Sequence, residues 1–408
     1  MVASLSINTS VSLSHSTTTV GDSSGAPDVV HVSVKTTATS LATGPSSIQS
    51  TNREHKWGTH ESHSVRTVGM TRTNRPIPIP TRVWGIPAPT PSAKPVTAVS
   101  NVLLLPRVLF NDITHLLYAF ANVLPNGTVV SSNPVVDTQQ IYDHSSTLPL
   151  SVKGSEGPGD FAAAAATEGS RRTFAQSAVR LVTDWGFDGL DVDWEYPASE
   201  TDRDNFVSLI TECRAEFNQY SRKNQLDYHF LVTVAASASP QNYEFVDFAR
   251  MDRNVDLWHL MAYDYTGNWT NTTAHQANVY ANPAHEAATK LNTDAAVLYY
   301  EAQGISPSKI VLGLPLYGRS FEGTSGLGCS YTTVGPSGGE YSYNTLPRPG
   351  AMVRFDDVAK ATFSYDNRTR ELVSYDDVRS TVVKAGYINK RHLAGAFFWE
   401  ASGDRGRE

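Results

Sequence analysis

Six short apolar segments, separated by stretches with a helical pattern, limit what this chain can fold into more than any other feature. Each segment has eight to ten residues and is almost continuous in apolar side chains. The segments are residues 114–123, 189–196, 230–237, 257–265, 310–318 and 393–400. Nearly continuous apolar strands are typical of a parallel sheet that is buried on both faces. Their alternation with helices predicts an α/β fold built from βαβ units.

The stretches before and after the second segment each carry one apolar helix face, with residues recurring at spacings of three and four. The first face comprises Phe174, Ala178, Leu181, Val182 and Trp185. The second comprises Phe206, Leu209, Ile210, Cys213, Phe217 and Tyr220. Gly186 follows the first face as a helix stop. We therefore expect helices to cover the strands.

The first hundred residues differ in composition from the rest of the chain. They contain 33 Ser and Thr residues but no Phe or Tyr, whereas all 33 Phe and Tyr residues of the protein follow residue 100. A segment with so little aromatic surface cannot offset the entropy lost on folding. Seven prolines between Pro76 and Pro95 indicate a stiff linker. We therefore predict that residues 1–100 are disordered and that residues 101–408 form the folded domain.

Charge and composition exclude several classes of protein. Forty acidic and 33 basic side chains give a net charge of −7, which does not support nucleic-acid binding. The sequence contains no run of eighteen apolar residues, which is about the length needed to span a membrane. Cys213 and Cys329 have no spacing typical of a zinc site. Nothing in the sequence implies a metal or an organic cofactor. The first twenty residues lack the basic and apolar regions of a secretory signal.

The most informative motif is DGLDVDWEYP at residues 188–197. Side chains alternate along a strand, so Asp191, Asp193 and Glu195 point to one face. An exposed acidic face of an amphipathic strand would also give this pattern. Here the apolar flanks predict burial on both faces, so the acids are expected to line a cavity, where at least one carboxyl pKa rises. Glu195 lies nearest the carboxyl end of the strand, which makes it the natural candidate for a general acid.

This motif resembles the D-G-x-D-x-D-W-E-x-P signature of glycoside hydrolase family 18, the chitinases, over ten consecutive positions. The resemblance continues through MAYD at 261–264, YGRSF at 317–321 and FWE at 398–400. It implies a (β/α)8 TIM barrel in residues 101–408, with the motif on the fourth strand. It also implies the fungal branch, in which a chitin insertion domain, a small α+β unit, would occupy residues 322–390 between strands seven and eight.

The resemblance implies a chitinase that hydrolyses β-1,4-linked N-acetylglucosamine polymers with retention of configuration, by a substrate-assisted route. Glu195 would be the acid and base, while the acetamido carbonyl of the substrate would attack the anomeric carbon. Asp193 would orient the acetamido group and share a proton with Asp191, and Tyr263 would hydrogen-bond the acetamido oxygen. The other residues expected to bind substrate are Tyr196, Met261, Asp264, Arg319 and Trp399.

Some of these roles have simpler alternatives. Trp399 would form the floor of the subsite for the reacting sugar, or it would occupy an ordinary core position. Arg319 would line the same subsite, or it would form a structural ion pair. His259 and the other histidines show no metal-ligand spacing, which favours packing or surface positions.

The sequence departs from the family pattern at the first and third strands. The third strand of the family ends in S-x-G-G, whereas residues 151–154 read SVKG, with Lys153 in place of the first Gly. No apolar run suited to a first strand precedes Thr114, because Pro106 interrupts residues 102–110. We therefore expect a barrel that is incomplete at strands one and three.

A chitin-binding protein of lectin type, without catalysis, is the alternative function. The acidic Glu is replaced in lectin-like relatives, and here Asp193 and Glu195 are both present, which favours catalysis. A glycoprotein-directed endo-N-acetylglucosaminidase would use the same acids, but the insertion domain argues against it. The expected partner is chitin or chito-oligosaccharides, bound by a monomer that contacts neither nucleic acid nor membranes. The resemblance implies an extracellular location, with a cytoplasmic one as the alternative because this sequence shows no signal.

Overall fold

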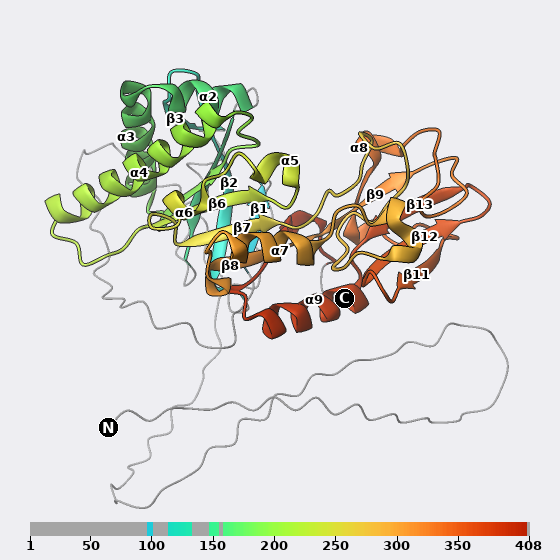
Figure 1. Cartoon of the computed structure of the whole chain (residues 1–408). Coiled ribbons are helices and arrows are strands. Elements are labelled where there is room, and N and C mark those ends of the chain that lie inside the picture. The colour runs from blue at the N-terminus through green and yellow to red at the C-terminus, as the bar shows by residue number, and fades with distance from the viewer. Residues whose placement is uncertain (1–95, 101–112, 133–146, 155–157, 406–408) are drawn as a thin grey trace, which may run out of the picture. The chain divides into compact units, whose positions relative to one another are not determined.

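Two β-sheets organise the part of the chain that the computed structural model describes, namely residues 96–100, 113–132, 147–154 and 158–405. The first sheet contains nine strands and the second contains five. Helices follow several strands of the first sheet, and the second sheet is inserted before its last strand (Figure 1). The predicted α/β class is confirmed. The predicted disorder concerns residues that, up to residue 95, lie outside the described part.

The first sheet is parallel except for one short strand. Its parallel strands, in chain order, are β1 (Val96–Ser100), β2 (His115–Val123), β4 (Pro149–Gly154), β5 (Gly189–Asp193), β6 (Leu231–Ser237), β7 (Leu257–Met261), β8 (Ile310–Pro315) and β14 (Gly395–Trp399). Each strand pairs with the next one in this order, and β1 also pairs in parallel with β14. The exception, β3 (Val129–Ser131), is antiparallel to β2. This succession gives a TIM-barrel-like α/β fold.

The prediction that the first and third strands are incomplete is wrong. The prediction rested on the interruption of residues 102–110 by Pro106, whereas β1 lies just before these residues and places Val96 opposite both His115 of β2 and Phe397 of β14. The third strand, β4, pairs in parallel with β2 and β5 although it contains Lys153. Pairing on two sides compensates for a weak local strand pattern, because strand preference depends strongly on context. The folded part therefore begins before the predicted boundary at residue 101.

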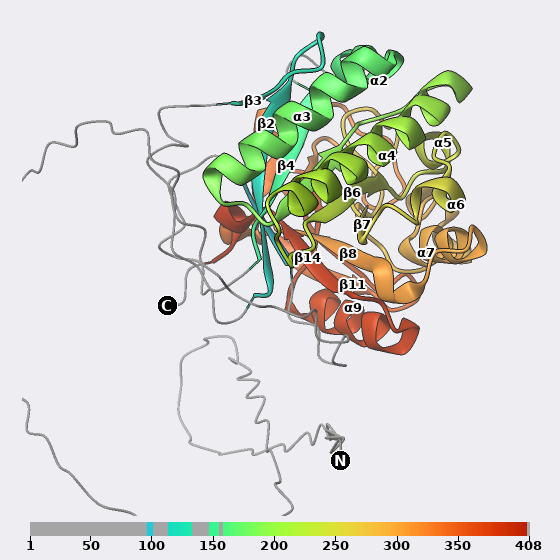
Figure 2. The ribbon, with the colours of Figure 1, turned by 90° about the vertical axis from the view of Figure 1, so that its left-hand side faces the viewer.

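The described helices do not all pack against the parallel strands, because the short helix at Pro336–Gly339 contacts strands of the second sheet instead. They are α2 (Pro158–Ala166), α3 (Glu168–Trp185), α4 (Glu200–Lys223), α5 (Pro240–Tyr243), α6 (Phe248–Met251), α7 (Thr293–Ala302), α8 (Pro336–Gly339) and α9 (Val378–Arg391). Figure 2 shows α2, α3 and α4 lying side by side over the strands. Both predicted helix faces are confirmed, since α3 buries Phe174, Ala178 and Val182 and α4 buries the face around Ile210.

Local capping fixes where the two long helices begin and end. The Thr167 side chain accepts a hydrogen bond from the backbone N–H of Ser170 at the start of α3, and Ser199 does the same for Asp202 at the start of α4. Gly186 ends α3 in the left-handed conformation, with φ 74°, as the sequence predicted. The turn after α3 leads directly into β5 and the acidic motif.

The second sheet lies between β8 and β14 in the sequence and is antiparallel. Its order is β10 (Glu340–Ser342), β9 (Tyr317–Phe321), β13 (Glu371–Tyr375), β12 (Ala361–Asp366) and β11 (Met352–Asp356). It has its own apolar clusters, one of which contains Phe321, Phe363, Tyr365 and Leu372. The sheet begins with β9, slightly before residues 322–390, and α9 follows it before the chain returns to β14.

Candidate active site

Strand β5 and the two residues that follow it bring the three acids close together. Asp191 and Asp193 lie on the strand and are 2% and 4% exposed, and Glu195 follows two residues later with a partly exposed side chain. The alternate residues Leu190, Val192 and Trp194 belong to the main apolar core, as expected when side chains alternate along a strand. The three acids therefore gather at the end of β5, with Asp191 and Asp193 buried and Glu195 partly exposed.

Three neighbouring strands hold the innermost acid, Asp191. Ser151 Oγ of β4 donates to Asp191 Oδ2 over 2.8 Å, and Thr233 Oγ1 of β6 donates to Oδ1 over 2.6 Å. His259 Nδ1 of β7 lies 2.8 Å from the same Oδ1. Burial alone would raise the pKa of Asp191, but His259 and these hydrogen bonds bring it below its ordinary value. Asp191 is thus a fixed carboxylate.

Asp193 has the opposite electrostatic environment. Burial and the negative charge of Glu195 raise its pKa well above the ordinary value, with a smaller contribution from Asp191, while Lys153 opposes the change. Asp193 Oδ1 is buried and has no hydrogen-bond partner among the described residues. The prediction that at least one carboxyl pKa rises in this cluster is confirmed. Both oxygens of Asp191 already contact Ser151, Thr233 or His259, and proton sharing between Asp193 and Asp191 stays a prediction.

Lys153 pairs directly with the outermost acid. Its Nζ atom lies 2.5 Å from Glu195 Oε1 and 3.8 Å from Asp193 Oδ2. The same atom lies 5.3 Å from the centroid of the Phe120 ring. Strands β4 and β5 place Lys153 opposite Asp193, which brings the ammonium group to the acids. The sequence marked Lys153 as a departure from the family pattern but did not reveal this contact.

Several residues predicted to bind substrate gather in one cluster beside the acids. Met261 ends β7, Tyr263 follows it, and Trp399 ends β14. All three pack against a small apolar cluster that contains Leu117, Val311 and Phe397. Trp399 also lies against Phe120, with ring centroids 5.3 Å apart.

Two tyrosines near the acids remain neutral phenols. Burial, followed by the charges of Asp193 and Glu195, raises the pKa of Tyr263 well above its ordinary value. The pKa of Tyr196 rises for the same reasons, burial first and then Glu195. Space at Tyr263 is tight, because a Cβ atom added to Gly313 would lie 2.7 Å from its ring. The two hydroxyl groups are therefore available as hydrogen-bond donors near the carboxylates.

Arg319 and Asp264 form a two-pronged ion pair. Arg319 Nε donates to Asp264 Oδ1 and Arg319 Nη2 donates to Oδ2, both over 2.7 Å. Arg319 also lies 3.3 Å from Glu340 of the second sheet, and its guanidinium group stands over the ring of Trp269. The structural ion pair considered for Arg319 is therefore present. The pair links the end of β7 to the second sheet.

The expectation that His259 is a packing or surface residue rather than a metal ligand did not include its contact with Asp191. His259 is 2% exposed and contacts Asp191. One sequence signal could have located it, because His259 precedes Met261 by two residues and therefore shares its strand face. No group of three or more His, Cys, Asp or Glu side chains in the described part could hold a metal ion.

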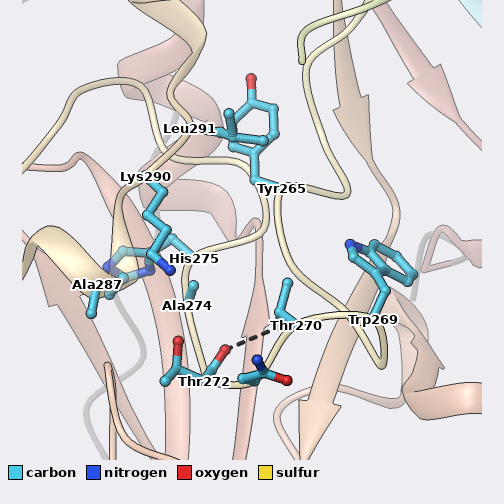
Figure 3. Close-up of a pocket in the computed structure, with 11 residues that line it drawn as sticks. Tyr265, Trp269, Thr270, Thr272, Ala274, His275, Ala287, Lys290 and Leu291 are labelled. Carbon is cyan, nitrogen blue, oxygen red and sulfur yellow. Dashed lines mark hydrogen bonds between the residues drawn. The ribbon is translucent and has the colours of Figure 1, made fainter. Parts of the chain in front are cut away.

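A separate cavity lies in the loop region that follows β7. It has a volume of about 310 Å³, and residues labelled in Figure 3, among them Tyr265, Trp269, His275 and Lys290, line it. The three acids are not among its lining residues.

Among the described helices, none is long and apolar enough to cross a membrane.

Comparison with known proteins places the chain in a family. The family model described as "Glycosyl hydrolases family 18" matches residues 95–404. The match includes β1, which begins at Val96. A curated relative, "Endochitinase 1" of Metarhizium robertsii, is 42% identical over 323 residues, which cover 72% of this chain and 76% of that protein.

Solved structures with similar folds include both enzymes and a binding protein. A class V chitinase mutant from Nicotiana tobaccum, solved in complex with NAG4, is 25% identical with a TM-score of 0.67 and covers 77% of this chain and 95% of its own. A chitinase-like agglutinin from Robinia pseudoacacia is 26% identical with a TM-score of 0.66 and covers 76% and 95%. The fold is thus shared by proteins that are named for catalysis and for binding.

Proposed function

The chain belongs to the glycosyl hydrolases of family 18, and we propose that it is a chitinase that cleaves β-1,4 linkages in N-acetylglucosamine polymers. One observation carries the proposal: Asp193 and Glu195 stand together at the end of β5, and Asp193 offers a buried oxygen without a partner among the described residues. The fold alone does not decide between hydrolysis and binding, because function depends on the residues of the site.

The proposed reaction is substrate-assisted and retains the anomeric configuration. Glu195 donates a proton to the glycosidic oxygen as the bond between that oxygen and C1 breaks. The acetamido carbonyl oxygen of the same sugar attacks C1 and forms an oxazolinium intermediate. Water then attacks C1 while the Glu195 carboxylate accepts its proton, which restores the acid. Alignment of an internal nucleophile gives effective molarities of about 10⁵ M or more, so positioning carries much of the rate.

Asp193 is suited to position the acetamido group. A buried acceptor without a donor is costly, and an acetamido N–H would satisfy Asp193 Oδ1. The raised pKa of Asp193 means that this carboxyl holds a proton at pH values where an exposed carboxyl has lost it. Asp191, fixed by its three donors, supports Asp193 from below through its negative charge.

The remaining contacts are assigned by what each side chain offers. Tyr263 donates a hydrogen bond to the acetamido oxygen, and the face of Trp399 packs against the sugar ring. Met261 adds apolar surface, and Tyr196 adds a second phenol beside Glu195. Asp264 and Arg319, held together as an ion pair, bind sugar hydroxyl groups.

The substitution Glu195→Gln tests this proposal. Removal of the general acid and base is expected to reduce the release of soluble products from chito-oligosaccharides by about 10²- to 10⁴-fold. Circular dichroism and the thermal midpoint check that the variant folds like the wild type. Equal activity in the two proteins contradicts the role of Glu195, and binding without cleavage by the wild type identifies the protein as lectin-like.

The partner, the oligomeric state and the location of the enzyme are proposed from its resemblance to family 18. We propose chitin or chito-oligosaccharides as its partner and a monomer as its working form. The residues between β8 and β14 are proposed to act as the chitin insertion domain, with the Arg319–Glu340 contact joining that unit to the site. An extracellular location is proposed, as expected for an enzyme whose polymeric substrate is outside the cell.

A further inference from the structure

Lys153 stands among the acids of the site, and the mechanism above does not use it. We propose that Lys153 is a positioning residue that holds Glu195 as an ionised carboxylate in the free protein and so moves hydrolysis toward acidic pH. The inference rests on the proposed function, because it concerns the protonation of the same general acid.

The backbone places the Lys153 side chain at the acids. Lys153 is the register partner of Asp193 in the parallel pair of β4 and β5. Two residues earlier on β4, Ser151 is the partner of Asp191 and donates to it, so this face of β4 points toward the acids. The position of Lys153 therefore follows from strand register, and its ammonium group reaches Glu195 Oε1 at 2.5 Å.

The charged and titratable groups around Glu195 come from three elements. Asp193 and Tyr196 belong to its own segment, Lys153 comes from β4, and Tyr263 follows β7. Among the described residues, Lys153 is the one cationic side chain within ion-pair distance of Glu195. His259 contacts Asp191 instead.

The ammonium group remains charged in this setting. Burial would lower the pKa of Lys153, but Asp193 and Glu195 raise it above its ordinary value. The pKa of Asp193 is raised as well, by burial first and then by the charge of Glu195. Glu195 itself faces the cation, with Lys153 Nζ 2.5 Å from its Oε1. A nearby cation stabilises a carboxylate relative to its protonated form.

This arrangement opposes the first step of the proposed reaction. Glu195 must hold a proton before it can donate one to the glycosidic oxygen. Because Lys153 favours the ionised form, a lower pH is needed to populate the productive form. A residue without charge at position 153, such as the Gly expected from the family pattern, would remove this requirement.

The test compares the pH dependence of kcat/KM for the wild type, Lys153→Met and Lys153→Arg on a soluble chito-oligosaccharide. Met keeps a similar length without the charge, whereas Arg keeps the charge. The basic limb of the Met profile is expected to move up by about one pH unit, at the low end for a neighbouring cation because both side chains are partly exposed. The Arg profile is expected to stay near that of the wild type.

A purely steric role for Lys153 gives a different result. If Lys153 only obstructs the subsite, Lys153→Gly lowers KM, and the basic limb stays in place for both the Gly and Met variants. That outcome overturns the inference. A basic limb that moves in the Met and Gly variants but not in the Arg variant supports it.

A second measurement separates this inference from the proposed function. Difference infrared spectroscopy follows protonation of the Glu195 carboxyl with pH, and subtraction of the Glu195→Gln spectrum assigns the band. Protonation at a higher pH in Lys153→Met than in the wild type supports the inference even if the wild type releases no product, in which case only the chitinase proposal fails. Protonation at the same pH in both proteins overturns the inference.

Discussion

Asp191 and Asp193 lie two residues apart on β5, yet their surroundings move their pKa values in opposite directions. Asp191 has a donor for each oxygen, and its pKa falls below the ordinary value of 3.8 despite burial. Asp193 has burial and Glu195 as its main influences, and its pKa rises. One strand thus carries two carboxyl groups whose pKa values move apart, which is the condition for different roles in acid–base chemistry.

The substitutions Asp191→Asn and Asp193→Asn are expected to change stability in opposite directions at neutral pH. A lowered folded-state pKa means that Asp191 contributes stability above pH 3.8, which is lost as the pH falls through its folded-state pKa. Asp191→Asn should therefore cost about 2–3 kcal/mol at pH 7. The folded-state pKa of Asp193 is raised, so above pH 3.8 the unfolded chain ionises this carboxyl more readily than the folded protein does, and the folded state loses stability. Asp193→Asn removes this loss and should therefore be more stable than the wild type at neutral pH.

Thermal unfolding between pH 3 and pH 8 measures both effects, and each variant serves as the control for the other. Both differences from the wild type should shrink toward acidic pH. Destabilisation by both variants to a similar extent at pH 7 would contradict the opposed environments.

The acids could be found from the sequence because an alternating strand pattern shows which residues share a face. Asp191, Asp193 and Glu195 needed no knowledge of distant residues. His259 and Lys153 could not be assigned in the same way, because their contacts depend on the register of β7 and β4 relative to β5. Contacts across strands are set by pairing, which the local sequence does not contain.

At the scale of elements, the sequence did not predict β1 because its stability depends on pairing with distant strands rather than on its local pattern. Its five residues, VTAVS, give a weak strand pattern directly after a proline-rich stretch. Pairing in parallel with both β2 and β14 provides partners on two sides. The long helices α3 and α4 were predicted correctly because their apolar faces and the Gly186 stop are local features.

The substitution Thr97→Pro tests whether β1 is needed for the fold. Thr97 is opposite Leu116 of β2 and Phe398 of β14, so a proline there removes an N–H from a strand that is paired on both sides. We expect a loss of at least about 2 kcal/mol in the free energy of unfolding. Ser92→Pro, before the strand, is the control and should leave stability close to that of the wild type, as measured by denaturant unfolding. Equal stability of the two variants would show that β1 is dispensable.

At the scale of the whole molecule, both the TIM-barrel-like sheet and the antiparallel sheet contribute residues at or near the site. Strands β4 to β7 provide the acids and their partners, and Arg319 of β9 joins Asp264 to Glu340 of β10. A similar fold occurs in a chitinase and in a chitinase-like agglutinin. Cleavage or binding by a protein of this fold is therefore decided by the residues of its site.

The anomeric form of the first product tests the central claim most directly. Proton NMR during the first minutes of chitotetraose hydrolysis distinguishes the β-anomer from the α-anomer before mutarotation mixes them. Substrate-assisted cleavage by Glu195 and Asp193 predicts that the new reducing ends are β. Initial release of the α-anomer, or intact chitotetraose after prolonged incubation with the folded protein, would contradict the account.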